Sequence, residues 1–192
     1  VDLEGNMVVA PQYHKAGKYS EGLVAVWKGG FWSYLDLKGD TVISDLKYRY
    51  AGEFQDGYAR LTYGSGSFGY VDRTGKRLRA PYLYFEKAGK YENGLAVVRE
   101  NKEWRLIDQR ANVRSALFKT RPEFHEGLAA VKNSKRYGLL SETGTPILEP
   151  EFDDIRYTRE LISVRSGDRI GYLTTEGEWI WRPDPGPASV RK

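Results

Sequence analysis

The stretch Tyr91-Glu-Asn-Gly94-Leu-Ala-Val-Val98 decides the fold, because the chain repeats its pattern. An aromatic residue, two variable residues and a Gly are followed by a run of residues that favour β-strands. The pattern occurs five times, at successive spacings of 35, 37, 33 and 33 residues. The copies begin at Tyr19, Phe54, Tyr91, Phe124 and Tyr157, and the last copy has lost the Gly. Near-constant spacing over five copies predicts a repeat architecture.

A second pattern follows each copy of the first and reads, in the first copy, Trp32-Ser-Tyr-Leu-Asp36-Leu-Lys-Gly39. Its Asp can accept the backbone N–H two residues on, and its Gly supplies a positive φ, so Asp-x-x-Gly predicts a tight turn. A third strand then leaves the turn, as in Thr41-Val42-Ile43. Each unit therefore reads as a three-stranded antiparallel meander, and no helical period is sustained anywhere.

Side-chain alternation indicates which faces of these strands are buried. The first strand of every copy carries apolar residues two and four positions after the motif Gly slot, which predicts one core face: Val24, Ala59, Ala96, Ala129 and Ile162, then Val26, Leu61, Val98, Val131 and Val164. The second strand is apolar on both faces, so we expect it to be central in its sheet. The Gly after its aromatic residue, as in Gly69, Gly138 and Gly171, predicts close approach of a neighbouring backbone.

Together these patterns resemble the bacterial WG-repeat family, also called KWG repeats. The resemblance runs from Asp2 to about Trp181, although the naming dipeptide is incomplete in every copy. Trp32-Ser33 and Trp104-Arg105 keep the Trp, whereas Phe68-Gly69, Tyr137-Gly138 and Ile170-Gly171 keep the Gly. The resemblance implies a repeat scaffold used for binding, found in cytoplasmic and exported proteins alike, with no common catalytic chemistry.

We therefore expect an all-β chain of stacked meanders in an open, solenoid-like array, with a closed propeller or barrel-like ring as the alternative. About 35 residues per unit is short for a propeller blade of roughly 40–45 residues. The N-terminal fragment, Asp2–Gly5 with a strand at Asn6–Val9, would also be surplus in a ring. The expected array covers residues 1–181, with a partial repeat at 1–18, repeats at 19–53, 54–90, 91–123, 124–156 and 157–181, and a disordered tail at 182–192.

Composition excludes several classes of protein. The 192 residues contain no Cys and only two His, His14 and His125, so disulfides, thiolate chemistry and multi-histidine metal sites are not expected. No apolar run approaches the roughly 18 residues of a membrane span, so we expect a soluble chain of undetermined compartment. A net charge of +4 is a weak field for nucleic acid. The sequence contains no nucleophile elbow and no phosphate loop, and we expect no catalysis, metal or cofactor.

The candidate binding residues share one register position, five residues past the motif Gly slot: Trp27, Thr62, Arg99, Lys132 and Arg165, with Tyr63 beside the second. Cations and a Trp in one row could bind an acidic polymer or an acidic protein face. The alternative is that charges at strand ends only keep the sheet edges solvated. We expect a protein partner, of inhibitor or immunity type, with polysaccharide, cell-wall polymer or another polyanion as the alternative ligand.

Overall fold

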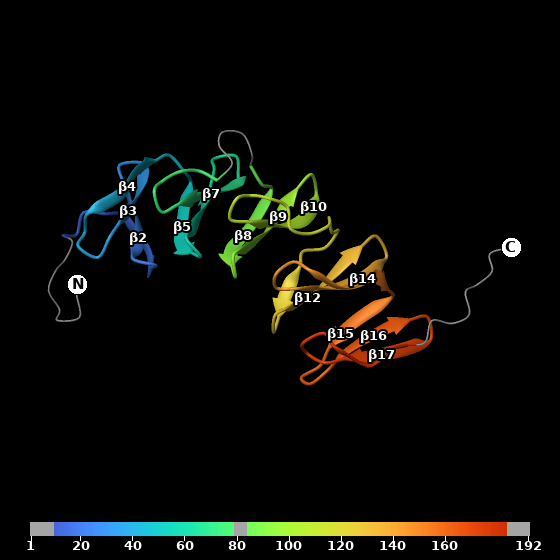
Figure 1. Ribbon diagram of the computed structural model, residues 1–192. Coiled ribbons are helices and arrows are strands. Elements are labelled where there is room, and N and C mark those ends of the chain that lie inside the picture. The colour runs from blue at the N-terminus through green and yellow to red at the C-terminus, as the bar shows by residue number, and fades with distance from the viewer. Residues whose placement is uncertain (1–9, 79–83, 184–192) are drawn as a thin grey trace. The chain divides into compact units, whose positions relative to one another are not determined.

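The computed structural model describes residues 10–78 and 84–183, which form strands and turns without a helix (Figure 1). The expected N-terminal fragment and residues 184–192 of the expected tail lie outside the described residues. The strands make five antiparallel sheets, none of them closed. The first three sheets contain β1 (Lys15–Ser20), β2 (Leu23–Lys28), β3 (Phe31–Leu35) and β4 (Thr41–Leu46); β5 (Tyr50–Gln55), β6 (Tyr58–Thr62) and β7 (Phe68–Asp72); and β8 (Lys87–Glu92), β9 (Leu95–Glu100) and β10 (Glu103–Asp108). The last two contain β11 (Glu123–His125), β12 (Leu128–Asn133), β13 (Arg136–Ser141) and β14 (Pro146–Phe152); and β15 (Asp154–Tyr157), β16 (Ile162–Ser166), β17 (Arg169–Leu173) and β18 (Trp179–Trp181).

Each sheet begins one strand earlier than the sequence patterns indicate. The motif Gly is not the start of a strand but the second residue of a two-residue hairpin turn. In the first copy, Glu21 and Gly22 have φ values of 50° and 84°, and this pair joins β1 to β2. The same pair of positive φ values recurs at Asp56-Gly57, Asn93-Gly94 and Glu126-Gly127. Two consecutive positive φ values are typical of the type I′ turn, whose twist matches that of the flanking strands.

The Asp-x-x-Gly turn is confirmed in detail. Asp36 Oδ1 accepts the backbone N–H groups of Lys38 and Asp40, each at 2.9 Å, and Gly39 has a φ of 84°. Asp72 and Asp108 make the equivalent pairs of bonds, and Ala111 takes the positive φ where the third copy has no Gly. A local side-chain bond and one left-handed residue therefore fix how each second strand passes into the third.

The predicted core face is confirmed: nine of its ten residues are buried, and Val24 is half-buried. The second strand is central where a third strand forms, as β3 lies between β2 and β4. The predicted approach of a neighbouring backbone is confirmed at Gly138 and Gly171, where a Cβ would lie 2.6 Å from the Leu148 carbonyl oxygen and 2.8 Å from that of Trp181. At Gly69 the neighbour is the Tyr63 ring and not a backbone. Side chains are excluded there because a neighbouring group already occupies the space.

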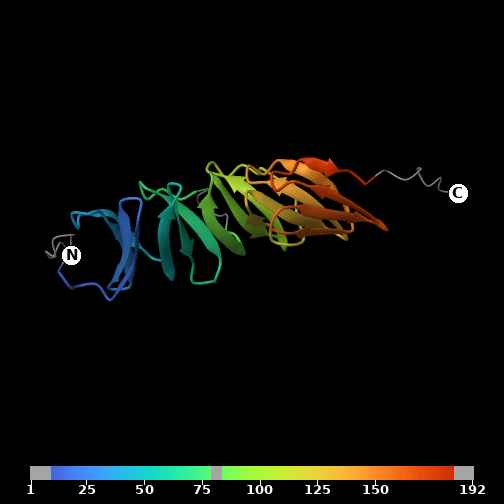
Figure 2. The ribbon, with the colours of Figure 1, turned by 90° about the horizontal axis from the view of Figure 1, so that it is seen from below.

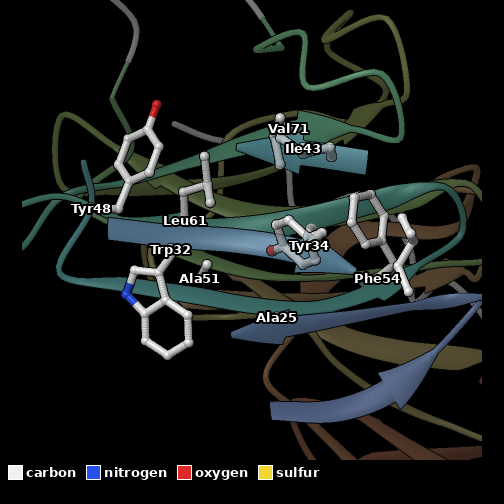
Figure 3. Close-up of a cluster of buried hydrophobic side chains, with 11 residues drawn as sticks. Ala25, Trp32, Tyr34, Ile43, Tyr48, Ala51, Phe54, Leu61 and Val71 are labelled. Carbon is white, nitrogen blue, oxygen red and sulfur yellow. The ribbon is translucent and has the colours of Figure 1, made fainter. Parts of the chain in front are cut away.

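The chain divides into two compact units, the first containing residues 1–102 and 107–113. In this unit β1 and β2 pack on β5, and β5 to β7 pack on β8 (Figures 1 and 2). One buried cluster joins the first two sheets, with the Tyr34 ring edge-on to Phe54 at 4.8 Å (Figure 3). The Tyr34 hydroxyl donates to the carbonyl of Gly52 at 2.7 Å, and Tyr70 donates to Gly89 at the same distance. The first copy is thus tied to the second, and the second to the third, by the hydroxyl of a buried Tyr.

The second unit contains residues 103–106 and 114–192. Its core lies between the fourth and fifth sheets, where aliphatic residues from both come together: Leu128, Leu139, Leu148, Ile155, Ile162, Val164 and Leu173. No helix in the part of the chain that the structure describes could span a membrane. Among the same residues, no three His, Asp or Glu side chains gather into a metal-binding group.

Candidate binding surface

The predicted register position is structurally equivalent in all five sheets. At each site the backbone carbonyl accepts an N–H from the segment before the sheet's first strand, at distances of 2.7 to 2.9 Å; the donor directly precedes that strand in four sheets and lies four residues before β11 in the fourth. The bonds are His14 to Trp27, Arg49 to Thr62, Glu86 to Arg99, Lys119 to Lys132, and Asp153 to Arg165. The first four of these side chains are half-buried and only Arg165 is exposed.

The two aromatic candidates contact residues of their own unit. Trp27 meets the His14 ring edge-on at 5.4 Å and carries Lys15 over its face at 5.5 Å. Tyr63 meets Tyr48 and Tyr84 edge-on, at 5.0 and 4.4 Å between ring centroids. Burial raises the pKa of Tyr63 to about 12, with the nearby Tyr48 hydroxyl adding to the effect. Both rings therefore serve packing within the first unit.

The remaining first-unit candidates lie on the same side of their strands. Arg99 Nε is 3.5 Å from the Glu86 carboxylate, and Thr62 pairs with Tyr50 across β5 and β6. This side of β2 and β6 faces the next sheet in the unit, as the bond from Arg60 to the Ala88 carbonyl illustrates. Packing between sheets accounts for the partial burial of Trp27 and Thr62.

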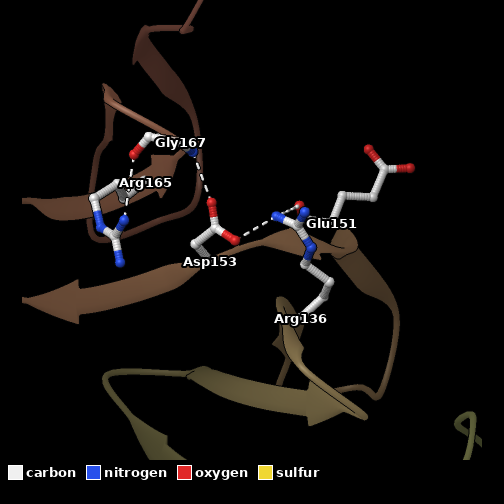
Figure 4. A network of polar contacts seen from close by, with 5 residues as sticks. All are labelled: Arg136, Glu151, Asp153, Arg165 and Gly167. Carbon is white, nitrogen blue, oxygen red and sulfur yellow. Dashed lines mark hydrogen bonds and ion pairs between the residues drawn. The ribbon is translucent and has the colours of Figure 1, made fainter. Parts of the chain in front are cut away.

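In the second unit, Lys132 and Arg165 belong to separate local networks. Lys132 Nζ lies 4.5 Å from the centre of the Tyr137 ring and 3.1 Å from its hydroxyl. Arg165 donates to the Gly167 carbonyl at 3.2 Å, beside Asp153 (Figure 4). Asp153 accepts the Gly167 N–H at 2.6 Å and also binds Arg136. That backbone N–H and the two guanidinium charges hold the pKa of Asp153 below its ordinary value.

The fifth sheet exposes a face that sequence reasoning missed. Cross-strand partners have their side chains on the same side of a sheet. Four such pairs lie on one side of the fifth sheet: Arg156–Ser163, Arg165–Ile170, Ser163–Tyr172 and Tyr172–Trp181. We call Arg156, Arg165, Ile170, Tyr172 and Trp181 the terminal face. Ile170 is 51% exposed, Tyr172 38% and Trp181 68%. A hollow of about 180 Å³ lies beside Ile170 and the two arginines.

The same side of the fourth sheet is buried, which explains why the terminal face was not predicted. Leu139, the counterpart of Tyr172, is fully buried against Ile155 and Ile162 of the fifth sheet. No later sheet follows the fifth among the described residues.

Comparison with solved structures places the fold among β-propeller-like proteins. Hsv2 from Kluyveromyces lactis, with its loop 6CD replaced by a Gly-Ser linker, gives a TM-score of 0.50 at 11% identity over 88% of this chain and 67% of that one. A eukaryotic initiation factor gives 0.47 at 13% identity, over 90% and 54%. PorZ, a surface component of the type-IX secretion system of Porphyromonas gingivalis, gives 0.41 at 10% identity, over 90% and 28%. The chain thus spans from 28% to 67% of the length of these three structures.

No curated protein matches the chain in sequence. The sequence pattern of the WG containing repeat matches residues 1–30, 32–64, 68–104 and 137–168, which together make up more than half of the chain. These matches include the type I′ turns at Gly22, Gly57 and Gly94, and the close-approach glycines Gly69 and Gly138. The chain therefore belongs to the family of proteins that contain the WG repeat.

Proposed function

We propose that the chain is a non-enzymatic protein-binding module and that the terminal face is its contact surface. The observation that carries the proposal is the exposure of Ile170, Tyr172 and Trp181 side by side on one sheet. Contiguous exposed apolar residues mark interaction sites, and Trp, Tyr and Arg dominate the energetics of protein interfaces. The fourth sheet buries this side against the fifth, which supports contact with protein rather than with solvent.

The charges of the terminal face specify the kind of partner. Arg156 pairs with Asp154 at 2.7 Å, and Arg165, the cross-strand partner of Asp154, donates to the Gly167 carbonyl beside Asp153. An apolar partner surface with carboxylates at its rim would complement both the rings and the guanidinium groups. An inhibitor or immunity-type protein that covers an acidic site on its target would bind in this way.

A polysaccharide is the second candidate ligand, and one observation favours it. Trp181 is 68% exposed, and an exposed indole offers a flat apolar surface on which a sugar ring can stack. A glycan array distinguishes this candidate from the first. Binding to glycans that disappears in Trp181→Ala, with no protein partner retained, would favour the polysaccharide.

The test is affinity capture of a partner protein from native lysate, followed by measurement of the affinity between that partner and the chain. Arg165→Glu and Trp181→Ala should each weaken binding by at least tenfold, the loss expected when an interface anchor is removed. Lys38→Glu changes charge equally at an exposed turn residue of the first unit and should bind like the native chain. The proposal fails if all three variants bind the partner equally.

The predicted register row has its own test. Arg99→Glu combined with Lys132→Glu should weaken binding if that row contacts the ligand. If the double variant binds normally while Trp181→Ala, which lies outside the row, does not, the terminal face is the contact surface. A binding loss restricted to the double variant would reverse that assignment.

A further inference from the structure

A carboxylate in the first hairpin turn of one copy accepts a backbone N–H from the corresponding turn of the next copy. In the first unit, Glu21 Oε2 accepts the N–H of Gly57 at 3.0 Å. Asp56 Oδ2 likewise accepts the N–H of Gly94 at 2.8 Å. The donor in both cases is the turn Gly, whose N–H is presented by the type I′ geometry. The acid before the turn Gly is therefore a link between copies.

The fifth copy breaks this series within the second unit. Glu126 occupies the position of the acid, but the next turn carries Arg159 and Glu160 where earlier copies have an acidic or Asn residue and Gly. Thr158 and Leu161 close that turn instead, with the Thr158 N–H donating to the Leu161 carbonyl at 2.8 Å. Among the described residues, Glu126 and Arg159 form no hydrogen bond or ion pair with each other or with any other group.

A hollow of about 520 Å³ lies where the link is missing, in the size range of small-ligand sites. Its lining comes from both sheets of the second unit: His125, Glu126, Tyr157, Thr158, Arg159, Ile162 and Thr175. The His125 and Tyr157 rings lie 5.5 Å apart, and Ile162 is buried beneath them in the core. An acid and a base that do not pair with each other thus line a hollow with an aromatic and aliphatic wall.

We propose that this hollow binds a small zwitterion of the α-amino-acid class with an apolar or aromatic side chain. The ligand's ammonium group replaces the missing Gly N–H as donor to Glu126. Its carboxylate binds the Arg159 guanidinium, whose planar fork suits that group. Its side chain lies against Tyr157 and Ile162. The site shares no residue with the terminal face, so the inference stands apart from the proposed protein partner.

The site is tested by calorimetric titration of the whole chain with L-phenylalanine and, in parallel, with glycyl-L-phenylalanine. Both molecules carry an ammonium group and a carboxylate, and the tighter binder shows whether a free amino acid or a short peptide fits. N-acetyl-L-phenylalanine lacks the ammonium group and phenethylamine lacks the carboxylate. Each should bind at least tenfold more weakly, because a charge-assisted hydrogen bond to the protein is lost.

Single substitutions test whether the charges of Glu126 and Arg159 bind the ligand. Glu126→Gln and Arg159→Gln should each weaken binding of the better ligand by about tenfold or more. Glu160→Gln is the matched control, because it changes a charge in the same turn at a residue that does not line the hollow. Its affinity should equal that of the native chain.

A final variant restores the missing link. Arg159→Asn combined with Glu160→Gly recreates the Asn-Gly turn of the third copy, so that the new Gly N–H can donate to Glu126. This variant should keep or raise the melting temperature and lose ligand binding. The inference is overturned if neither zwitterion binds at millimolar concentration, or if Glu126→Gln binds as tightly as the native chain.

Discussion

Replacing Tyr34 by Phe isolates the buried hydroxyl that links the first copy to the second. The Tyr34 side chain is fully buried and donates to the Gly52 carbonyl at 2.7 Å, while its ring packs edge-on against Phe54. Phe keeps the ring contact and leaves the carbonyl without its donor. An unsatisfied buried acceptor costs about 1–3 kcal/mol, and we expect a loss of about 2 kcal/mol.

The measurement is differential scanning calorimetry together with urea unfolding followed by circular dichroism. In a chain of this length each kcal/mol corresponds to about 2–4 °C, so the melting temperature of the chain should fall by about 4–8 °C. Tyr58→Phe is the control, since its hydroxyl donates to the Gln109 carbonyl at an exposed site and should contribute below about 0.5 kcal/mol. The reasoning is refuted if the two variants lose the same stability, or if Tyr34→Phe changes stability by less than about 0.5 kcal/mol.

Three further substitutions test other parts of the fold by the same unfolding measurements. Gly138→Ala should destabilise the fold by about 2 kcal/mol or more, because the new Cβ would lie 2.6 Å from a backbone oxygen. Ser33→Ala at the equivalent position of the first copy should be nearly neutral. Equal losses of stability in the two variants would contradict the close-approach argument. Lys102→Gly should stabilise by about 1 kcal/mol, because Lys102 is exposed with a φ of 64°, and a loss of stability would show that this strain is absent. The hydrogen bond from Lys90 lowers the pKa of Glu53 in the folded chain. This pair therefore stabilises the fold at pH values above the ordinary glutamate pKa of about 4.3. The contribution is lost as the pH falls from that value through the lowered pKa of Glu53. In Glu53→Gln, the free energy of unfolding should therefore fall less between pH 5 and pH 3 than in the native chain, by a fraction of about 1 kcal/mol. If its dependence on pH in this range is unchanged, the pair does not contribute to stability.

The features predictable from the sequence are those that depend on local geometry. The Asp36 turn needs only a side chain that reaches two residues along the chain, and this bond is present. The burial of Val98 and its counterparts follows from strand alternation within one copy. Such features repeat with the sequence because each copy contains everything that produces them.

The first strand of each sheet was missed because its sequence gives little strand signal. β1 reads Lys-Ala-Gly-Lys-Tyr-Ser and is almost entirely exposed, so it shows no alternation of apolar and polar residues. Its pairing with β2 is set by the Glu21-Gly22 turn, a less familiar type I′ pair than Asn-Gly. The copy with Asn93-Gly94 carried the clearest signal.

The candidate sites were harder to predict because they depend on what a neighbouring copy lacks. Tyr172 holds a position that is buried in the fourth sheet, as Leu139, and Ile170 a position that is half-buried there, as Tyr137; among the described residues no later sheet covers them. Glu126 resembles its counterparts in sequence and differs only because the following turn has Glu160 in place of Gly. The lost Gly of the fifth copy was visible in the sequence, but its consequence required the bond between Glu21 and Gly57.

The bonds that join one copy to the next have a shared chemistry with an evolutionary consequence. Tyr34 and Tyr70 donate to backbone carbonyls, and Glu21 and Asp56 accept from backbone N–H groups. Each bond requires a particular side chain on one partner and only main chain on the other. A duplicated or deleted copy can therefore dock on its new neighbour without paired substitutions, so the length of such an array can change in one genetic step while its copies diverge independently.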